Sequence, residues 1–114
     1  MDVRSLDEAR ANIDRLDRDI IRAMAEREFF VRQAARFKAT PDDVKAPPRV
    51  EQVIARVRAH AAEAGLEPKI AEITYRAMIA AFIDLEQGVL ETKSGSPRFS
   101  MLDDKRQFDA DQRD

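Results

Sequence analysis

The chain has 114 residues, of which 37% are charged and 44% hydrophobic, with 3 glycines and no tryptophan. This length suits one small domain, and the composition favours helices over a sheet-rich fold. The sequence has no cysteine, which excludes disulfides and thiolate nucleophiles, and its one histidine, His60, cannot form a zinc site alone, so we expect no metal. A net charge of −2 argues against nucleic-acid binding, and neither a membrane-spanning run nor a signal peptide is evident, so we expect a cytoplasmic protein.

The first predicted helix begins at Ser5 and extends to about Lys38. Ser5 and Glu8 match the capping box of a helix start, in which the hydroxyl accepts from the Glu8 amide. Apolar residues then follow a 3,4 spacing that only Arg27 interrupts, namely Leu6, Ala9, Ile13, Leu16, Ile20, Ala23, Phe30, Ala34 and Phe37. A helix of this length is a rod of about 50 Å, which one small chain cannot cover, so we expect a dimer.

A proline-rich loop from Ala39 to Pro48 ends this helix, because proline lacks an amide donor and restricts its predecessor. A second helix is predicted from Pro48 to Gly65, and a third from Pro68 to about Leu90. Their predicted core residues are Val50, Val53, Ile54, Val57 and Ala61, then Ala71, Tyr75, Met78, Phe82, Leu85 and Val89. The sequence therefore predicts an all-α domain of residues 5–92, with a long, a short and a medium helix, and a disordered tail of residues 93–114.

Basic residues recur where an anion would be needed. Arg27 lies within the apolar stripe, where an unpaired charge costs several kcal/mol, so we expect an anion opposite it. The alternative is an internal ion pair with Glu86 or a guanidinium that reaches solvent. Lys38 follows eleven residues later and returns to within about 20° of the same face, although a cation is also common in a helix's last turn. Arg10 lies about 25 Å before Arg27, so only antiparallel pairing of two first helices would bring both to one ligand.

Two further residues complete the candidate set. Arg49 follows the double proline at a predicted helix start, which favours an anion, although a solvated arginine is more common there. Glu86 lies among apolar residues of the third helix, and its protonation state cannot be read from the sequence.

Five segments, taken in chain order, resemble the all-helical (type II) chorismate mutases over residues 5–90. They are Arg10-x-x-Ile13-x-x-Leu16-Asp17, Ala25-Glu26-Arg27, Arg36-Phe37-Lys38, Pro48-Arg49 and Phe82-Ile83-x-x-Glu86. The resemblance implies an intertwined homodimer of six helices that binds a small cyclic dicarboxylate and needs no metal or cofactor. It also implies a site formed by Arg27, Lys38, Arg49, Val50, Phe82 and Glu86 of one subunit and Arg10 of the other. Within this site, Lys38, Glu86 and Arg27 would stabilise the charge that grows on the ether oxygen in a Claisen rearrangement.

The sequence departs from many members of this family at two positions. Ala46 and Val50 occupy places where many members have Asp and Glu, which contact the ring hydroxyl of chorismate. This change, with the R-F-K and A-P-x-R-V segments, resembles the isochorismate pyruvate lyase branch, whereas Glu86 replaces a Gln expected in that branch. We therefore predict a chorismate mutase, with lyase activity on isochorismate as the alternative and a non-enzymatic helical dimer as a remote one.

Overall fold

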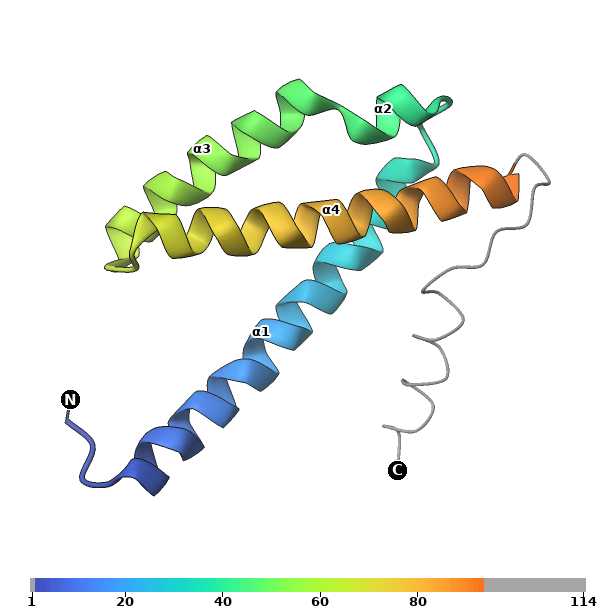
Figure 1. Ribbon diagram of the computed structural model, residues 1–114. Coiled ribbons are helices and arrows are strands. Elements are labelled where there is room, and N and C mark those ends of the chain that lie inside the picture. The colour runs from blue at the N-terminus through green and yellow to red at the C-terminus, as the bar shows by residue number, and fades with distance from the viewer. Residues whose placement is uncertain (1, 94–114) are drawn as a thin grey trace, which may run out of the picture.

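The computed structural model describes residues 2–93 and contains no strand within them. Four helices follow one another: α1 (Leu6–Ala35), α2 (Pro41–Lys45), α3 (Pro47–Ala64) and α4 (Pro68–Lys93). The prediction of an all-α chain with three main helices is thus confirmed. The predicted tail covered residues 93–114; Lys93 is instead the last residue of α4, and residues 94–114 lie outside the described residues. In Figure 1, α3 and α4 lie side by side and α1 crosses α4 at an angle. No helix in the described range is long and apolar enough to span a membrane.

Helix α1 begins as predicted but ends earlier. The Ser5 hydroxyl accepts a hydrogen bond from the Glu8 amide at 3.0 Å. The helix ends at Ala35, so the prediction that it extends to about Lys38 was wrong. The backbone amides that follow Ala35 donate to carbonyls only three residues back, as in the 3.1 Å hydrogen bond from Lys38 N to Ala35 O. The helix stops because Pro41 lies ahead and because the next amides find a side-chain acceptor, described below.

The connection between α1 and α3 contains the short helix α2, which the loop prediction missed. Thr40 caps it, because its side chain accepts from the Asp43 amide at 3.2 Å. Pro41 occupies the first helical position, where proline is favoured. Val44 is buried, and α2 packs against α4. Ala46 then takes a left-handed conformation (φ 36°), which turns the chain sharply into α3.

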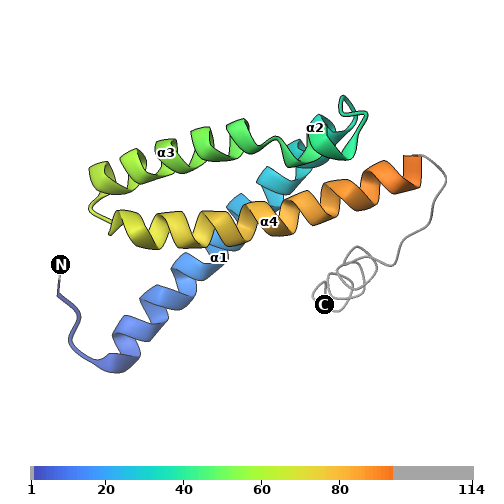
Figure 2. The same cartoon turned by 45° about the horizontal axis from the view of Figure 1, so that its top comes forward.

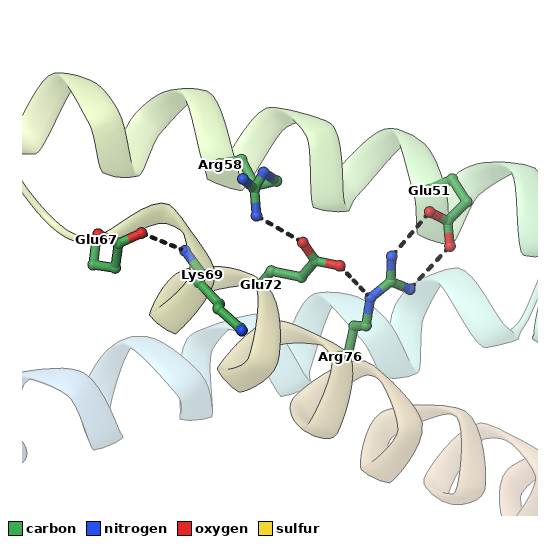
Figure 3. A network of polar contacts seen from close by, with 6 residues as sticks. All are labelled: Glu51, Arg58, Glu67, Lys69, Glu72 and Arg76. Atoms are coloured by element: carbon green, nitrogen blue, oxygen red, sulfur yellow. Dashed lines mark hydrogen bonds and ion pairs between the residues drawn. The ribbon is translucent and has the colours of Figure 1, made fainter.

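Helices α3 and α4 form an antiparallel hairpin that turns at Gly65. Gly65 has φ 83°, which glycine adopts without steric cost, and α3 ends there as predicted. The residues buried along the hairpin include Ile54, Ala61, Ala71, Ile79 and Leu85. Figure 3 shows a polar network on the outside of the hairpin, in which Arg76 of α4 contacts both Glu51 of α3 and Glu72 of its own helix.

Most of α1 has nothing packed on it. Ala35, in its last turn, is its only buried residue, although the helix has 30 residues and a length of about 45 Å. Figure 2 shows its first half extending away from the α3–α4 hairpin. The apolar stripe of that half stays exposed, with Leu6 63%, Ile13 55% and Ile20 53% accessible. An exposed stripe of this length is typical of a helix that packs against another chain.

Candidate functional site

A cavity of about 320 Å³ lies where the end of α1, α2, the start of α3 and the second half of α4 meet. Its walls bring together residues as far apart in sequence as Arg27 and Glu86. Cavities of this size bind small organic molecules. The three main helices and α2 thus shape a single hollow that a short ligand could fill.

Four cationic side chains and one carboxylate line this cavity. The cations are Arg27, Lys38, Lys45 and Arg49, and the carboxylate is Glu86. Four positive charges against one negative charge leave an excess of three positive charges around the hollow. Such an excess attracts an anion and favours one with two carboxylates over a neutral molecule.

The closest polar contact in the cavity joins Lys38 and Glu86. The Lys38 Nζ donates to Glu86 Oε2 at 2.6 Å, and the two side chains are 26% and 8% exposed. Helix α4 buries Glu86, so its carboxylate needs this partner. An ammonium has three N–H donors, and Lys38 therefore keeps donors for a ligand while it holds Glu86.

Arg27 is held in a different way, by cation–π contacts with two aromatic rings of α4. Its guanidinium carbon lies 5.0 Å from the ring centre of Phe82 and 5.9 Å from that of Tyr75. Among the described residues, Glu86 pairs with Lys38 and not with Arg27. The internal Arg27–Glu86 ion pair considered from the sequence is therefore not formed. The rings orient the planar guanidinium and leave its donors available for a carboxylate.

Arg49 lies in the first turn of α3 and is exposed. One of its terminal nitrogens donates to Gln52 Oε1 at 2.8 Å, which keeps the side chain near the helix surface. The other guanidinium donors remain available at the mouth of the cavity. The turn at Ala46 starts α3, so Arg49 enters the lining from a different helix than Arg27, which comes from α1.

The remaining walls are apolar. Val50 and Phe82, both expected in the site, line the cavity together with Phe30, Val31, Val53 and Ile79. Ala46 also lies in the wall, so neither this position nor Val50 supplies a carboxylate to the hollow. A ring with few polar groups of its own would fit this surface.

Of the seven predicted site residues, six line the same cavity and one does not. The six are Arg27, Lys38, Arg49, Val50, Phe82 and Glu86. Arg10 lies in the first turns of α1, is exposed and is not in the wall. Sequence reasoning missed Lys45, which comes from α2. The T-P-D-D sequence before it carries the signal of a helix start, with Thr as the cap and Pro in the first turn.

A second cavity, of about 380 Å³, is almost entirely apolar. It lies between the middle of α1 and the first half of α4, and Ile20, Met24, Leu66, Ile70 and Met78 are among its residues. Leu66 and Ile70 are 46% and 54% exposed, so this surface continues the uncovered stripe of α1. It offers space for apolar side chains of a packed helix and few groups for a polar ligand.

Comparison with known proteins agrees with the geometry. Residues 9–87 match the family model described as chorismate mutase type II. An isochorismate pyruvate lyase from Pseudomonas aeruginosa is 34% identical over 82 residues, which cover 72% of this chain and 81% of that protein. The matched span includes every residue that lines the first cavity.

Proposed function

Because the chain belongs to the chorismate mutase type II family, we propose that it is a chorismate mutase, which converts chorismate to prephenate in the cavity around Lys38 and Glu86. The observation that carries the proposal is the set of cations around an apolar hollow. Chorismate has two carboxylates, one on its ring and one on its enolpyruvyl arm. Arg27 and Arg49, which reach the cavity from α1 and α3, suit these two groups. Residues 5–92 would form the catalytic domain.

In the proposed reaction, the ether C–O bond breaks while a C–C bond forms between the enolpyruvyl methylene and the ring. Both events belong to one pericyclic step, so the protein supplies no nucleophile and transfers no proton. Its tasks are to fold the arm over the ring and to stabilise negative charge on the ether oxygen. Lys38 has donors left for that oxygen, and Glu86 orients the ammonium through its 2.6 Å contact.

We propose further that the functional unit is a homodimer with two equivalent sites, each completed by Arg10 of the other subunit. The exposed stripe of α1 and the apolar cavity beside Met24 and Ile70 support this, because burying both would remove large apolar surfaces from water. Two antiparallel α1 helices would bring Arg10 of one subunit toward Arg27 of the other. The additional cation would help to compensate the dianionic substrate.

Isochorismate pyruvate lyase activity is the second candidate. It is favoured by the apolar Ala46 and Val50 in the wall and by the lyase relative. In that reaction the same ether bond breaks, but a ring hydrogen moves to the methylene and the products are salicylate and pyruvate. Isochorismate has its ring hydroxyl at a different ring carbon from chorismate, so its binding does not depend on carboxylates at positions 46 and 50.

Separate incubation with chorismate and with isochorismate distinguishes the two candidates. Prephenate formation at a higher kcat/KM than salicylate formation supports the mutase, and the reverse supports the lyase. A protein that converts neither substrate would contradict both. The Lys38→Ala variant serves as a control, because its kcat should fall well below that of the wild type if the activity belongs to this cavity.

A further inference from the structure

We propose that Asp43 is a positioning residue for Lys38, and that it sets the turnover rate by holding the segment between α1 and α2 in place. Asp43 does not line the cavity and would not touch a substrate. The inference rests on the proposed function, because Lys38 is taken there to act on the ether oxygen.

The carboxylate of Asp43 binds the two amides that directly follow Lys38. Its Oδ2 accepts from Ala39 N at 3.1 Å and from Thr40 N at 3.2 Å, and its own amide donates back to the Thr40 hydroxyl at 3.2 Å. Lys38 N in turn donates to Ala35 O, the last residue of α1. The backbone on the carboxyl side of Lys38 is thus fixed by Asp43, and on the other side by the helix end.

Helix α2, which carries Asp43, is itself fixed against α4. Val44, next to Asp43, is 3% exposed and anchors α2, which packs on α4. Gln87 of α4 also donates to Pro41 O at 3.5 Å. Since α4 also carries Glu86, a closed path runs from Lys38 through Asp43 and α2 to the helix that bears its ion-pair partner.

Apolar packing does not hold the segment, so the hydrogen bonds of Asp43 carry this role. Phe37 is 86% exposed, and Ala39 and Thr40 are exposed as well. The Ala39 and Thr40 amides lower the pKa of Asp43 below its ordinary value, and nearby Lys38 adds to the effect, so the acceptor is ionised at neutral pH. Loss of the carboxylate would leave both amides to water and let Lys38 leave its position beside Glu86.

The test compares Asp43→Ala and Asp43→Asn with Asp42→Ala, in the full chain. Asp42 is the neighbouring exposed carboxylate. Among the described hydrogen bonds, the Ala39 and Thr40 amides donate to Asp43 and not to Asp42. We expect Asp43→Ala to lower kcat about tenfold or more, with a smaller change in KM because Arg27 and Arg49 still bind the carboxylates. Asp43→Asn keeps an acceptor oxygen and should recover most of the loss, while Asp42→Ala should match the wild type.

Two further measurements separate positioning from general stability. In a Lys38→Ala background, Asp43→Ala should cause little further loss, because its effect acts through Lys38. Hydrogen exchange at the Ala39 and Thr40 amides should accelerate in Asp43→Ala and stay unchanged in Asp42→Ala. Any of three results would overturn the inference. They are an unchanged kcat in Asp43→Ala, an equal fall in kcat with and without Lys38, and unaltered hydrogen exchange at the Ala39 and Thr40 amides. A wild type inactive on both substrates would contradict the proposed function alone, and the exchange rates would still decide whether Asp43 holds the segment.

Discussion

The Lys38 ammonium and the Glu86 carboxylate lie 2.6 Å apart, although 48 positions separate them in the sequence. Lys38 comes from the connection after α1 and Glu86 from the second half of α4, so this contact exists only in the folded chain. Arg27, which interrupts the apolar stripe, instead makes cation–π contacts with Phe82 and Tyr75. The cavity therefore contains one lysine already oriented by a carboxylate and one arginine whose donors are free to bind a ligand.

Substitution of Glu86 by Gln tests the role of this carboxylate. The amide can still accept from Lys38 and can donate to the ether oxygen, so we expect Glu86→Gln to keep kcat/KM within about tenfold of the wild type. A fall of more than about a hundredfold in kcat/KM would contradict this expectation, because it would mean that the negative charge of Glu86 is itself required.

Substitution of Arg27 by Met distinguishes an anion site from a structural charge. Methionine preserves much of the side chain's length and packing on Phe82, while it removes the charge. We expect the free energy of unfolding to stay within about 1 kcal/mol of the wild type or to increase, because no buried partner is left unpaired. Activity should fall by about a hundredfold or more, as for loss of a transition-state donor. Thermal unfolding and kinetics on the same samples test both expectations, and full activity in the variant would refute an anion-binding role.

Val50 tests the preference between the two substrates. A glutamate there would place a carboxylate in the cavity wall, where it could accept a hydrogen bond from the ring hydroxyl of chorismate. We expect Val50→Glu to raise the ratio of kcat/KM for chorismate over isochorismate by about tenfold. Val50→Gln, which has the same length without the charge, is the matched control. A ratio that shifts toward isochorismate would contradict this account of the wall.

The outer network of the α3–α4 hairpin predicts a loss of stability in acid. Hydrogen bonds from Arg76 hold the pKa values of Glu51 and Glu72 below 4.5, their ordinary value. Between the lowered pKa values and 4.5, the unfolded chain therefore binds more protons than the folded chain. The stabilisation from this network is fully present above about pH 4.5 and is lost as the pH falls through the lowered pKa values. We expect Arg76→Met to lower Tm by a few degrees at neutral pH, with a difference that shrinks as the pH falls below 4.5.

The control for this prediction is Arg56→Met on α3, because Arg56 is exposed and no salt bridge is found for it in the described chain. Exposed ion pairs contribute little individually, but Arg76 contacts Glu51 with two nitrogens, at 2.9 and 3.0 Å, and Glu72 with a third. A difference in Tm that persists in acid would mean that Arg76 acts through packing instead of charge.

The sequence predicted most of the fold because strong local signals mark the helix boundaries. Ser5 with Glu8, Gly65 and Pro68 each mark a helix start or end by local chemistry, and the structure agrees at each of them. The stretch from Arg36 to Ala46 was harder to predict, because the Asp43 side chain competes there with the helix for backbone amides. A periodic pattern continues through Phe37, so it carries no sign of this competition.

The candidate site was predictable in its residues but not in its pairings. Arg27 and Glu86 both stood out as charges among apolar neighbours, and both line the cavity. The cation that pairs with Glu86 is Lys38, and its position depends on the turn after Ala35. Helical geometry alone could not predict this turn. Arg10 remains a prediction, because it depends on a second chain.

Mixing two inactive variants tests the shared site most directly. In a dimer of Arg10→Ala with Arg27→Met, one site combines an intact cavity with an intact Arg10, and the other site has lost both. We expect each variant to be dimeric and inactive alone. After unfolding and refolding at equal concentrations, half of the dimers are mixed, so about a quarter of wild-type activity should return. A mixture that stays inactive, or an Arg10→Ala protein that is fully active by itself, would contradict a site shared between subunits.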